Sequence, residues 1–163
     1  MNFRSVAAGA ALITLSTSAS ADMPAEITAP GQTEVVTLHA QGAQIYECAA
    51  AKDGKLAWSF REPIATLMLN GKTVGRHYAG PNWEYMDGSI VVAKVTGRAR
   101  GATAKDIPWL KLTAASHRGS GKFSDIATIQ RINTSGGQLE GACSQAGAFN
   151  SVAYSTDYVF LKK

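Results

Sequence analysis

Apolar residues recur at every second position through long stretches of the chain, and this period of two constrains the fold more than any other feature. It is clear in residues 55–60, 65–69 and 91–95, and near the C-terminus, where Tyr154, Thr156, Tyr158 and Phe160 share one face. Successive side chains of a strand point to opposite faces of a sheet, so this spacing predicts strands with one buried face. The composition agrees, because residues 22–163 contain 27 Val, Ile and Thr against 8 Leu, and β-branched residues favour a pleated sheet.

Turn-forming dipeptides separate these stretches. Asn70-Gly71 lies between two short apolar runs, and Asp53-Gly54 and Asp87-Gly88 are similar. Tight hairpin turns need positive φ angles, which Gly and Asn tolerate. Strands are expected near residues 34–39, 44–50, 55–60, 65–69, 73–78, 83–86, 89–96, 109–114, 123–133 and 152–161. The prediction is an all-β domain, an antiparallel sandwich or partly closed barrel of about 9–10 short strands.

The first 21 residues have the pattern of a secretory signal peptide. Arg4 gives a positive start, residues 6–15 are mostly apolar, and small residues end at Ala21 in an A-x-A pattern. An apolar run of this length is too short to span a bilayer. We therefore expect cleavage after Ala21, a periplasmic or secreted protein, and a single all-β domain in residues 22–163. No later stretch is long and apolar enough for a membrane-spanning helix.

The chain has two cysteines, Cys48 and Cys143. In an oxidising compartment an even pair is most simply a disulfide. The alternative is a reactive thiol, but there is no C-x-x-C spacing and no His beside either cysteine. We expect a structural Cys48–Cys143 bridge.

Residues 76–88 hold the densest collection of chemically capable side chains. His77 with Glu84 or Asp87 would provide a histidine and a carboxylate for acid–base catalysis. Three aromatic residues in the same segment could instead stack on a flat ligand such as a sugar ring: Tyr78, Trp83 and Tyr85. The alternative to both is a well-packed corner in which the aromatic rings fill the core and an acidic residue caps the Asp-Gly turn.

A second candidate segment is Ile107-Pro108-Trp109-Leu110-Lys111-Leu112. If Leu110 and Leu112 point inward, Trp109 and Lys111 lie on the opposite face. An exposed Trp beside a Lys would be a binding feature, whereas a covered Trp would be structural. Arg131 is a further candidate, as a residue that holds an anion.

Other kinds of site have little support in the sequence. The three histidines, His39, His77 and His117, are too far apart in the chain for a local chelate, and we expect no metal. No glycine-rich phosphate loop or nucleophile elbow is present, and we expect no cofactor. The charge of residues 22–163 is only +3, from 15 Lys and Arg against 12 Asp and Glu, and export argues against a nucleic-acid partner. Basic residues do concentrate in one third of the chain and could meet an anionic envelope component: Arg98, Arg100, Lys105, Lys111, Arg118 and Lys122.

Several segments together resemble domain of unknown function family 3455, a family of secreted bacterial and fungal proteins. The resemblance covers most of residues 34–161 and is carried by residues 42–48, 75–84, 87–89, 107–112 and 129–137 and by the Tyr-rich final strand. It implies an exported protein of one domain and assigns no catalytic residue.

Three functions follow as hypotheses. The first is an exported protein that binds a small molecule, a carbohydrate or an anionic envelope component through its aromatic-rich loop, together with Trp109 and Lys111. The second is a small hydrolase-like enzyme that uses His77 with Glu84 or Asp87. The third is a purely structural envelope protein. The exposure of the tryptophans and the surroundings of His77 distinguish them.

Overall fold

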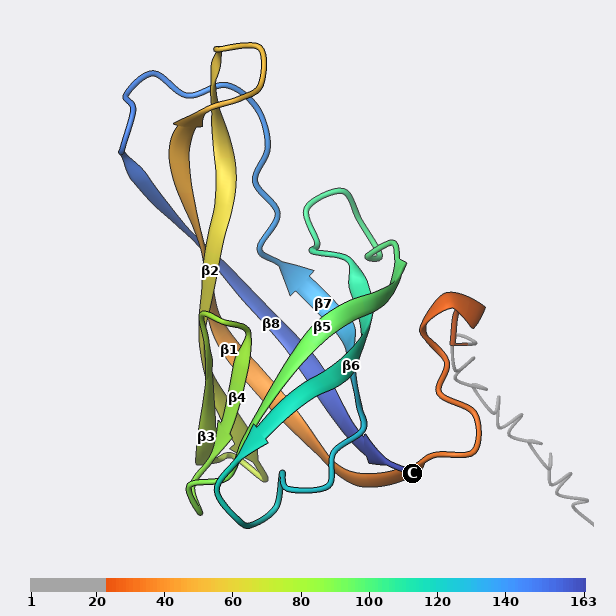
Figure 1. The fold of residues 1–163 in the computed structure, drawn as a ribbon. Coiled ribbons are helices and arrows are strands. Elements are labelled where there is room, and N and C mark those ends of the chain that lie inside the picture. The colour runs from red at the N-terminus through yellow and green to blue at the C-terminus, as the bar shows by residue number, and fades with distance from the viewer. Residues whose placement is uncertain (1–22) are drawn as a thin grey trace, which may run out of the picture.

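The structure is a computed structural model that describes residues 23–163, and its fold is an antiparallel ring of strands (Figure 1). The elements are η1 (Ala25–Ile27), β1 (Thr33–Ala50), β2 (Leu56–Leu69), β3 (Lys72–Tyr78), β4 (Asn82–Tyr85), β5 (Ile90–Ala99), β6 (Trp109–Arg118), β7 (Thr128–Gly136) and β8 (Phe149–Lys162). The expected signal peptide, residues 1–21, lies outside the described residues.

Each strand pairs with the next one in the chain, and β8 returns to pair with β1, which closes the ring. The all-β, antiparallel prediction is confirmed. The strands are fewer and longer than expected, because residues 34–39 and 44–50 belong to one strand, β1, and the strands expected near residues 55–60 and 65–69 are one strand, β2. Gly42 does not break this strand. It lies where β1 passes so close to β2 that a Cβ would overlap the Ile64 carbonyl oxygen.

The predicted turns lie where the dipeptides place them. Asn70 and Gly71 connect β2 to β3 with φ angles of 51° and 75°, the left-handed values that a two-residue hairpin turn requires. Gly54 and Gly88 also have positive φ, between β1 and β2 and between β4 and β5. The strand expected at residues 123–133 starts later than predicted: residues 123–125 lie in a turn, residues 126 and 127 are irregular, and β7 begins at Thr128.

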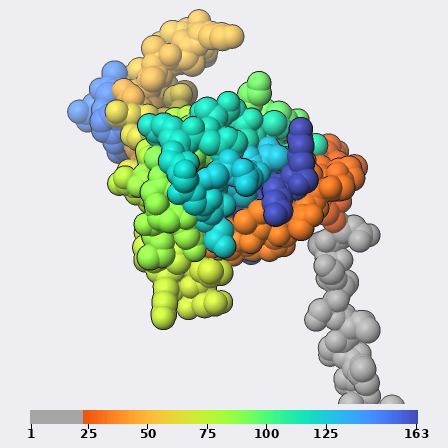
Figure 2. Space-filling model, turned by 60° about the horizontal axis from the view of Figure 1, so that its bottom comes forward, coloured from red at the N-terminus to blue at the C-terminus, as the bar shows by residue number. Residues whose placement is uncertain are grey.

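The strands differ strongly in length, and this shapes the molecule. β1 has 18 residues and β2 has 14, whereas β3 has 7 and β4 only 4. The end of β1 and the start of β2, residues 46–60, therefore extend beyond the ring as what we call the distal hairpin (Figure 1). Figure 2 shows the same hairpin projecting from the body beside the blue β7–β8 connection.

A disulfide between Cys48 and Cys143 fastens the distal hairpin to the β7–β8 connection, as predicted. The two Cα atoms are 5.9 Å apart, within the usual range for a disulfide. Tyr46 adds a second attachment, because its hydroxyl donates to the Gly137 carbonyl at 2.7 Å and accepts from the Leu139 amide at 3.3 Å. The hairpin is thus fastened at two points to the β7–β8 connection, at one mouth of the ring.

The opposite mouth is closed by apolar side chains, which we call the packed end. The β6–β7 connection folds across it and inserts Phe123 and Ile126, which are 0% and 1% exposed. The Phe123 ring stacks on Phe160, with 4.3 Å between the centroids, and Tyr85 meets Phe123 edge to face. Burial of such side chains stabilises a fold by about 1.5–3 kcal/mol each.

The segment before β1 covers part of the outer surface of the ring. η1 lies against β5 and β6, and Ile27 is fully buried there. Gln130 on β7 donates to the Ile27 carbonyl at 2.7 Å. None of the helical structure in residues 23–163 is long and apolar enough to cross a membrane.

Candidate functional site

A cavity of about 190 Å³ opens into the ring beside the short β3–β4 hairpin. The tip of the β3–β4 hairpin reaches only about as far as Ala65 on β2 and Val92 on β5, and both of those strands continue beyond it. The wall of the ring therefore has a gap there, between β2 and β5. Residues of the hairpin tip, 79–81, form one side of the opening, and Phe60 and Val95 form others. Deeper in the cavity lie Gln44, His77, Trp83, Leu110, Leu112, Arg131 and Tyr158. We call this region the cavity end.

Three aromatic rings in mutual contact form the floor of the cavity end. His77 lies parallel to Trp83, with 4.2 Å between the centroids, and Tyr158 meets both rings edge to face. The Nδ1 of His77 donates to the Asn82 carbonyl at 2.8 Å, which leaves Nε2 as the acceptor of the ring. Burial, opposed by this hydrogen bond and assisted by the charge of Arg131, lowers the pKa of His77 to about 3. The imidazole is therefore neutral at ordinary pH.

Polar atoms without partners gather around these rings. Of the seven buried side-chain polar atoms that lack a hydrogen-bond partner in residues 23–163, three belong to the cavity lining: Gln44 Nε2, Trp83 Nε1 and Tyr158 Oη. A fourth, Tyr154 Oη, belongs to a residue that lies beside Tyr158 but does not line the cavity. Burial raises the pKa of Tyr158, and the nearby Arg131 guanidinium and Tyr154 hydroxyl oppose that rise. A buried polar group without a partner costs about 1–3 kcal/mol, so such a concentration is typical of a binding site rather than of a core.

Arg131 lines the same cavity from β7. Its Nε and Nη2 atoms donate to the Pro108 carbonyl at 3.0 and 2.9 Å, which fixes the guanidinium in place. Within the part of the chain that the structure describes, no carboxylate forms an ion pair with it. The cavity end therefore contains a positive charge and no matching negative one.

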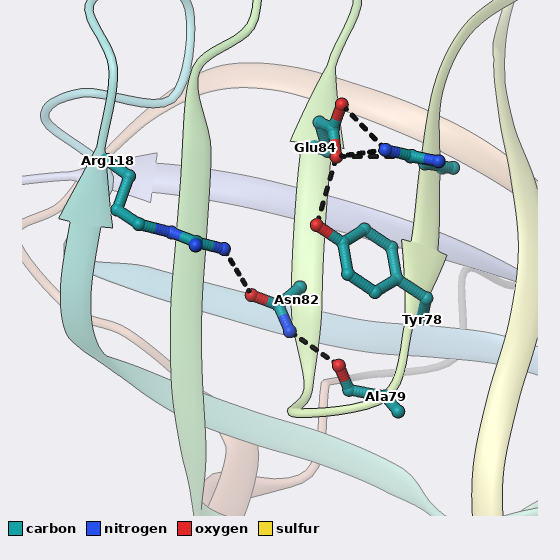
Figure 3. A network of polar contacts seen from close by, with 6 residues as sticks. Tyr78, Ala79, Asn82, Glu84 and Arg118 are labelled. Atoms are coloured by element: carbon teal, nitrogen blue, oxygen red, sulfur yellow. Dashed lines mark hydrogen bonds and ion pairs between the residues drawn. The ribbon is translucent and has the colours of Figure 1, made fainter.

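The outer face of the β3–β4 hairpin carries a separate polar network (Figure 3). The Glu84 carboxylate accepts hydrogen bonds from Arg76 and, at 2.9 Å, from the Tyr78 hydroxyl. The hydrogen bond from Arg76 holds the pKa of Glu84 below its usual value. Arg118 reaches from β6 and donates to the side chain of Asn82. This network links side chains of β3, β4 and β6 on the outer face of the ring.

The candidate catalytic pairs are not brought together. His77 pairs with Trp83 across the two strands and points inward, whereas Glu84 pairs with Arg76 and points outward, because neighbouring residues of a strand face opposite sides. Asp87 lies in the β4–β5 turn, where its carboxylate accepts from Ser89 and from the Lys122 amide. Those hydrogen bonds lower the pKa of Asp87, and Asp87 caps the turn, as the packed-corner alternative expects.

The candidate ligand-binding residues divide between the two faces of the ring. Trp83 and Arg131 line the cavity, and Tyr85 points inward at the packed end. Tyr78 is in the outer network. Trp109 is half-buried, and Lys111 donates to the Thr28 carbonyl at 3.2 Å under the N-terminal segment. Of the two alternatives for this segment, the partial burial of both side chains favours the covered, structural one over an exposed Trp beside a Lys.

The basic residues do not form one surface. Arg98 lies near the end of β5 and Arg118 at the end of β6, and Arg118 pairs with Ile90 at the start of β5. Eight residues of strand separate the two positions, or about 26 Å. The three histidines are apart as well, and no group of three metal-binding side chains occurs in residues 23–163.

Sequence reasoning missed Gln44, Tyr154 and Tyr158 as site residues. The alternation of β8 correctly predicts that both tyrosines face inward, and they are 3% and 0% exposed. A strand that carries two tyrosines on its core face, where Phe would suffice for packing, was the available signal. A similar signal existed for Gln44, which is a polar residue on the strand face that also carries Ala40 and Tyr46.

Ring and cavity together define a class: disulfide-linked, all-β proteins whose closed antiparallel ring encloses a partly polar cavity. The family described as protein of unknown function (DUF3455) matches residues 29–71 and 68–162. The chain belongs to this family. No curated protein and no solved structure matches it.

Proposed function

We propose that the protein is an exported binding protein that takes a small, mainly apolar molecule into the cavity end of its ring, with no chemistry of its own. The observation that carries the proposal is the cluster of unpaired buried polar atoms around a cavity that opens to solvent. Ligand sites are typically concave and mostly apolar, with a few polar groups that fix orientation. An apolar cavity of about 150 Å³ takes up benzene, so about 190 Å³ suits one substituted ring or a short aliphatic chain.

Export is supported by two features. The first is the signal-peptide pattern in residues 1–21. The second is the disulfide, a bond that persists in oxidising compartments. The aromatic-rich segment takes part in binding through its inner face, with Trp83 and His77, rather than through an exposed loop. A carbohydrate polymer fits less well, because the opening is small and the lining is mainly apolar.

Catalysis by His77 has less support than binding. A general base works best with a pKa near the operating pH, and a histidine with a pKa of about 3 is a weak base. Among residues 23–163, no carboxylate is hydrogen-bonded to its ring.

Thermal unfolding of the disulfide-bonded protein tests the proposal, with a panel of single-ring aromatic and short aliphatic compounds. A ligand at one hundred times its Kd should stabilise the fold by about 2.7 kcal/mol. The variant Val95→Trp should abolish the shift, because Val95 is exposed at the opening and a large side chain there would obstruct it.

The matched control is Thr96→Trp, since the Thr96 side chain contacts Thr113 and lies outside the cavity. If no compound raises the Tm, or if Val95→Trp responds as the unaltered protein does, the binding proposal is wrong. A panel without any effect would favour the purely structural hypothesis.

A further inference from the structure

The polar atoms at the cavity end are mainly hydrogen-bond donors. Gln44 Nε2 and Trp83 Nε1 can only donate, and the hydroxyl of Tyr158 can donate as well as accept. Besides that hydroxyl, the neutral side-chain acceptors of the lining are Nε2 of His77, whose other ring nitrogen is already bonded, and the Gln44 side-chain oxygen. A ligand that satisfies this set must bring acceptors.

The charges of the cavity lining also favour a ligand that brings acceptors. Arg131 lines the cavity and has no ion-pair partner in residues 23–163. Arg61, the other arginine of the lining, is at the opening, where its Nε lies 3.4 Å from Glu62 and its guanidinium covers the Phe149 ring. The interior therefore has one unmatched positive charge.

We infer that the ligand is a small monocarboxylic acid, bound with its carboxylate at Arg131, Trp83 and Tyr158 and its apolar part toward the opening. This inference rests on the proposed function and names its ligand class. A carboxylate is planar, carries one charge and accepts several hydrogen bonds, which suits a single guanidinium with neighbouring donors. A phosphate dianion would need a second unpaired cation.

The apolar part of the acid has a matching surface. Leu110 and Leu112 lie beside Arg131, and Phe60, Pro63 and Val95 continue the apolar lining to the opening. A molecule with a carboxylate at one end and a ring or short chain at the other would bury its apolar part and satisfy the donors at once.

Matched pairs of acids and amides test the inference, because an amide has nearly the same shape as its acid and no charge. The probes are benzoate with benzamide, 3-phenylpropanoate with 3-phenylpropanamide, and hexanoate with hexanamide, measured by calorimetry and thermal shift at pH 7. In at least one pair the acid should bind about 10-fold or more tightly than its amide.

Arg131→Gln should weaken binding of that acid by about 10- to 100-fold and change binding of its amide by less than about 3-fold. Arg131→Lys should recover part of the loss, since it keeps the charge. The matched control is Arg98→Gln, which removes the same charge from an exposed position outside the cavity. Unfolding curves of all three variants identify any that fail to fold.

The outcomes separate the two proposals. If amides bind as tightly as their acids, or if Arg131→Gln folds and binds the acid as well as Arg98→Gln does, the carboxylate inference is wrong and the binding function stands. If neither member of any pair binds and the wider panel is also without effect, both proposals fail.

Discussion

The two ends of the ring interior are built from the same alternating strands but filled in different ways. At the packed end, Phe123 and Phe160 stack and Ile126 fills the remaining space, all with at most 1% exposure. At the cavity end, Trp83 and Tyr158 are equally buried, yet their polar atoms have no partners and open space lies beside them.

This difference shows that burial alone does not mark a residue as part of the structural core. An aromatic residue at the packed end stabilises the fold by filling space, whereas the Tyr158 hydroxyl at the cavity end has no partner within hydrogen-bond distance and should add little stability. Truncation of an aromatic side chain should therefore reduce the free energy of unfolding strongly at the packed end. Removal of a polar atom should change it little at the cavity end.

The largest effect is expected from Phe123→Ala, which removes the side chain that closes the packed end. Loss of a fully buried Phe that stacks on Phe160 should reduce the free energy of unfolding by about 3–5 kcal/mol. Leu110→Ala at the cavity end should cost less, near about 2 kcal/mol, because Leu110 already borders open space. Chemical denaturation measures both, and equal losses would show that the two ends are packed alike.

Removal of the disulfide by Cys48→Ala and Cys143→Ala together should cost about 2–4 kcal/mol. The loss should be local as well, since the bond joins the distal hairpin to the β7–β8 connection. In hydrogen exchange, amides of residues 44–50 should lose protection relative to those of residues 158–161. Uniform loss along the chain would contradict this view of the disulfide.

Acidification should destabilise the protein through His77 before it affects the carboxylates. The pKa of His77 is about 3 in the fold and about 6.5 in the unfolded chain. The unfolded state therefore binds the extra proton first, and stability falls as pH drops from about 6.5 toward 3, by about 2 kcal/mol between pH 7 and pH 5.

His77→Asn should remove most of that slope, because an amide can still donate to the Asn82 carbonyl but does not titrate. Denaturation curves at pH 7, 6 and 5 provide the comparison. Glu84, Asp87 and Asp106 have lowered pKa values, so their contribution is lost only below about pH 4. An unchanged slope in His77→Asn would show that another group titrates in this window.

The smallest effect is expected from Tyr158→Phe. Its hydroxyl has no partner within hydrogen-bond distance, although Tyr154, Arg131 and Trp83 lie near it. The free energy of unfolding should therefore stay within about 1 kcal/mol of the original value or rise slightly. Tyr46→Phe is the matched comparison, since that hydroxyl bonds both Gly137 and Leu139 and its loss should cost about 1–2 kcal/mol. A larger loss for Tyr158→Phe than for Tyr46→Phe would mean that the Tyr158 hydroxyl is structurally bonded.

The sequence predicted the fold well where signals were local. The Asn70-Gly71 turn and the inward face of β8 follow from two or three residues and the strand period, and both are confirmed. The disulfide followed from the parity of the cysteines and the expected compartment.

The sequence could not predict which parts of the strands lie inside the ring. Phe60 alternates as regularly as Leu67, yet it is 52% exposed while Leu67 is fully buried. Val95 alternates with Val91 and Ala93 but is 46% exposed. Burial at these positions depends on the lengths of the neighbouring strands, and β3 and β4 are too short to cover them.

The candidate site was predicted in part. Segment 76–88 does contribute Trp83 and His77, but composition could not show that Glu84 and Asp87 face away from His77. That separation follows from strand register, since Glu84 lies opposite Arg76. The other half of the site comes from β1, β7 and β8, which meet β3 and β4 only when the ring closes.

Closure of the ring by its first and last strands has a consequence for how the chain acquires its structure. β1 pairs with β8 over nearly its whole length, so the free edge of β1 has no partner until the C-terminal residues are available. Contacts this distant in sequence make folding slow, and unpaired edges invite association with other chains. A portion of the chain that lacks either β1 or β8 therefore contains a sheet with open edges.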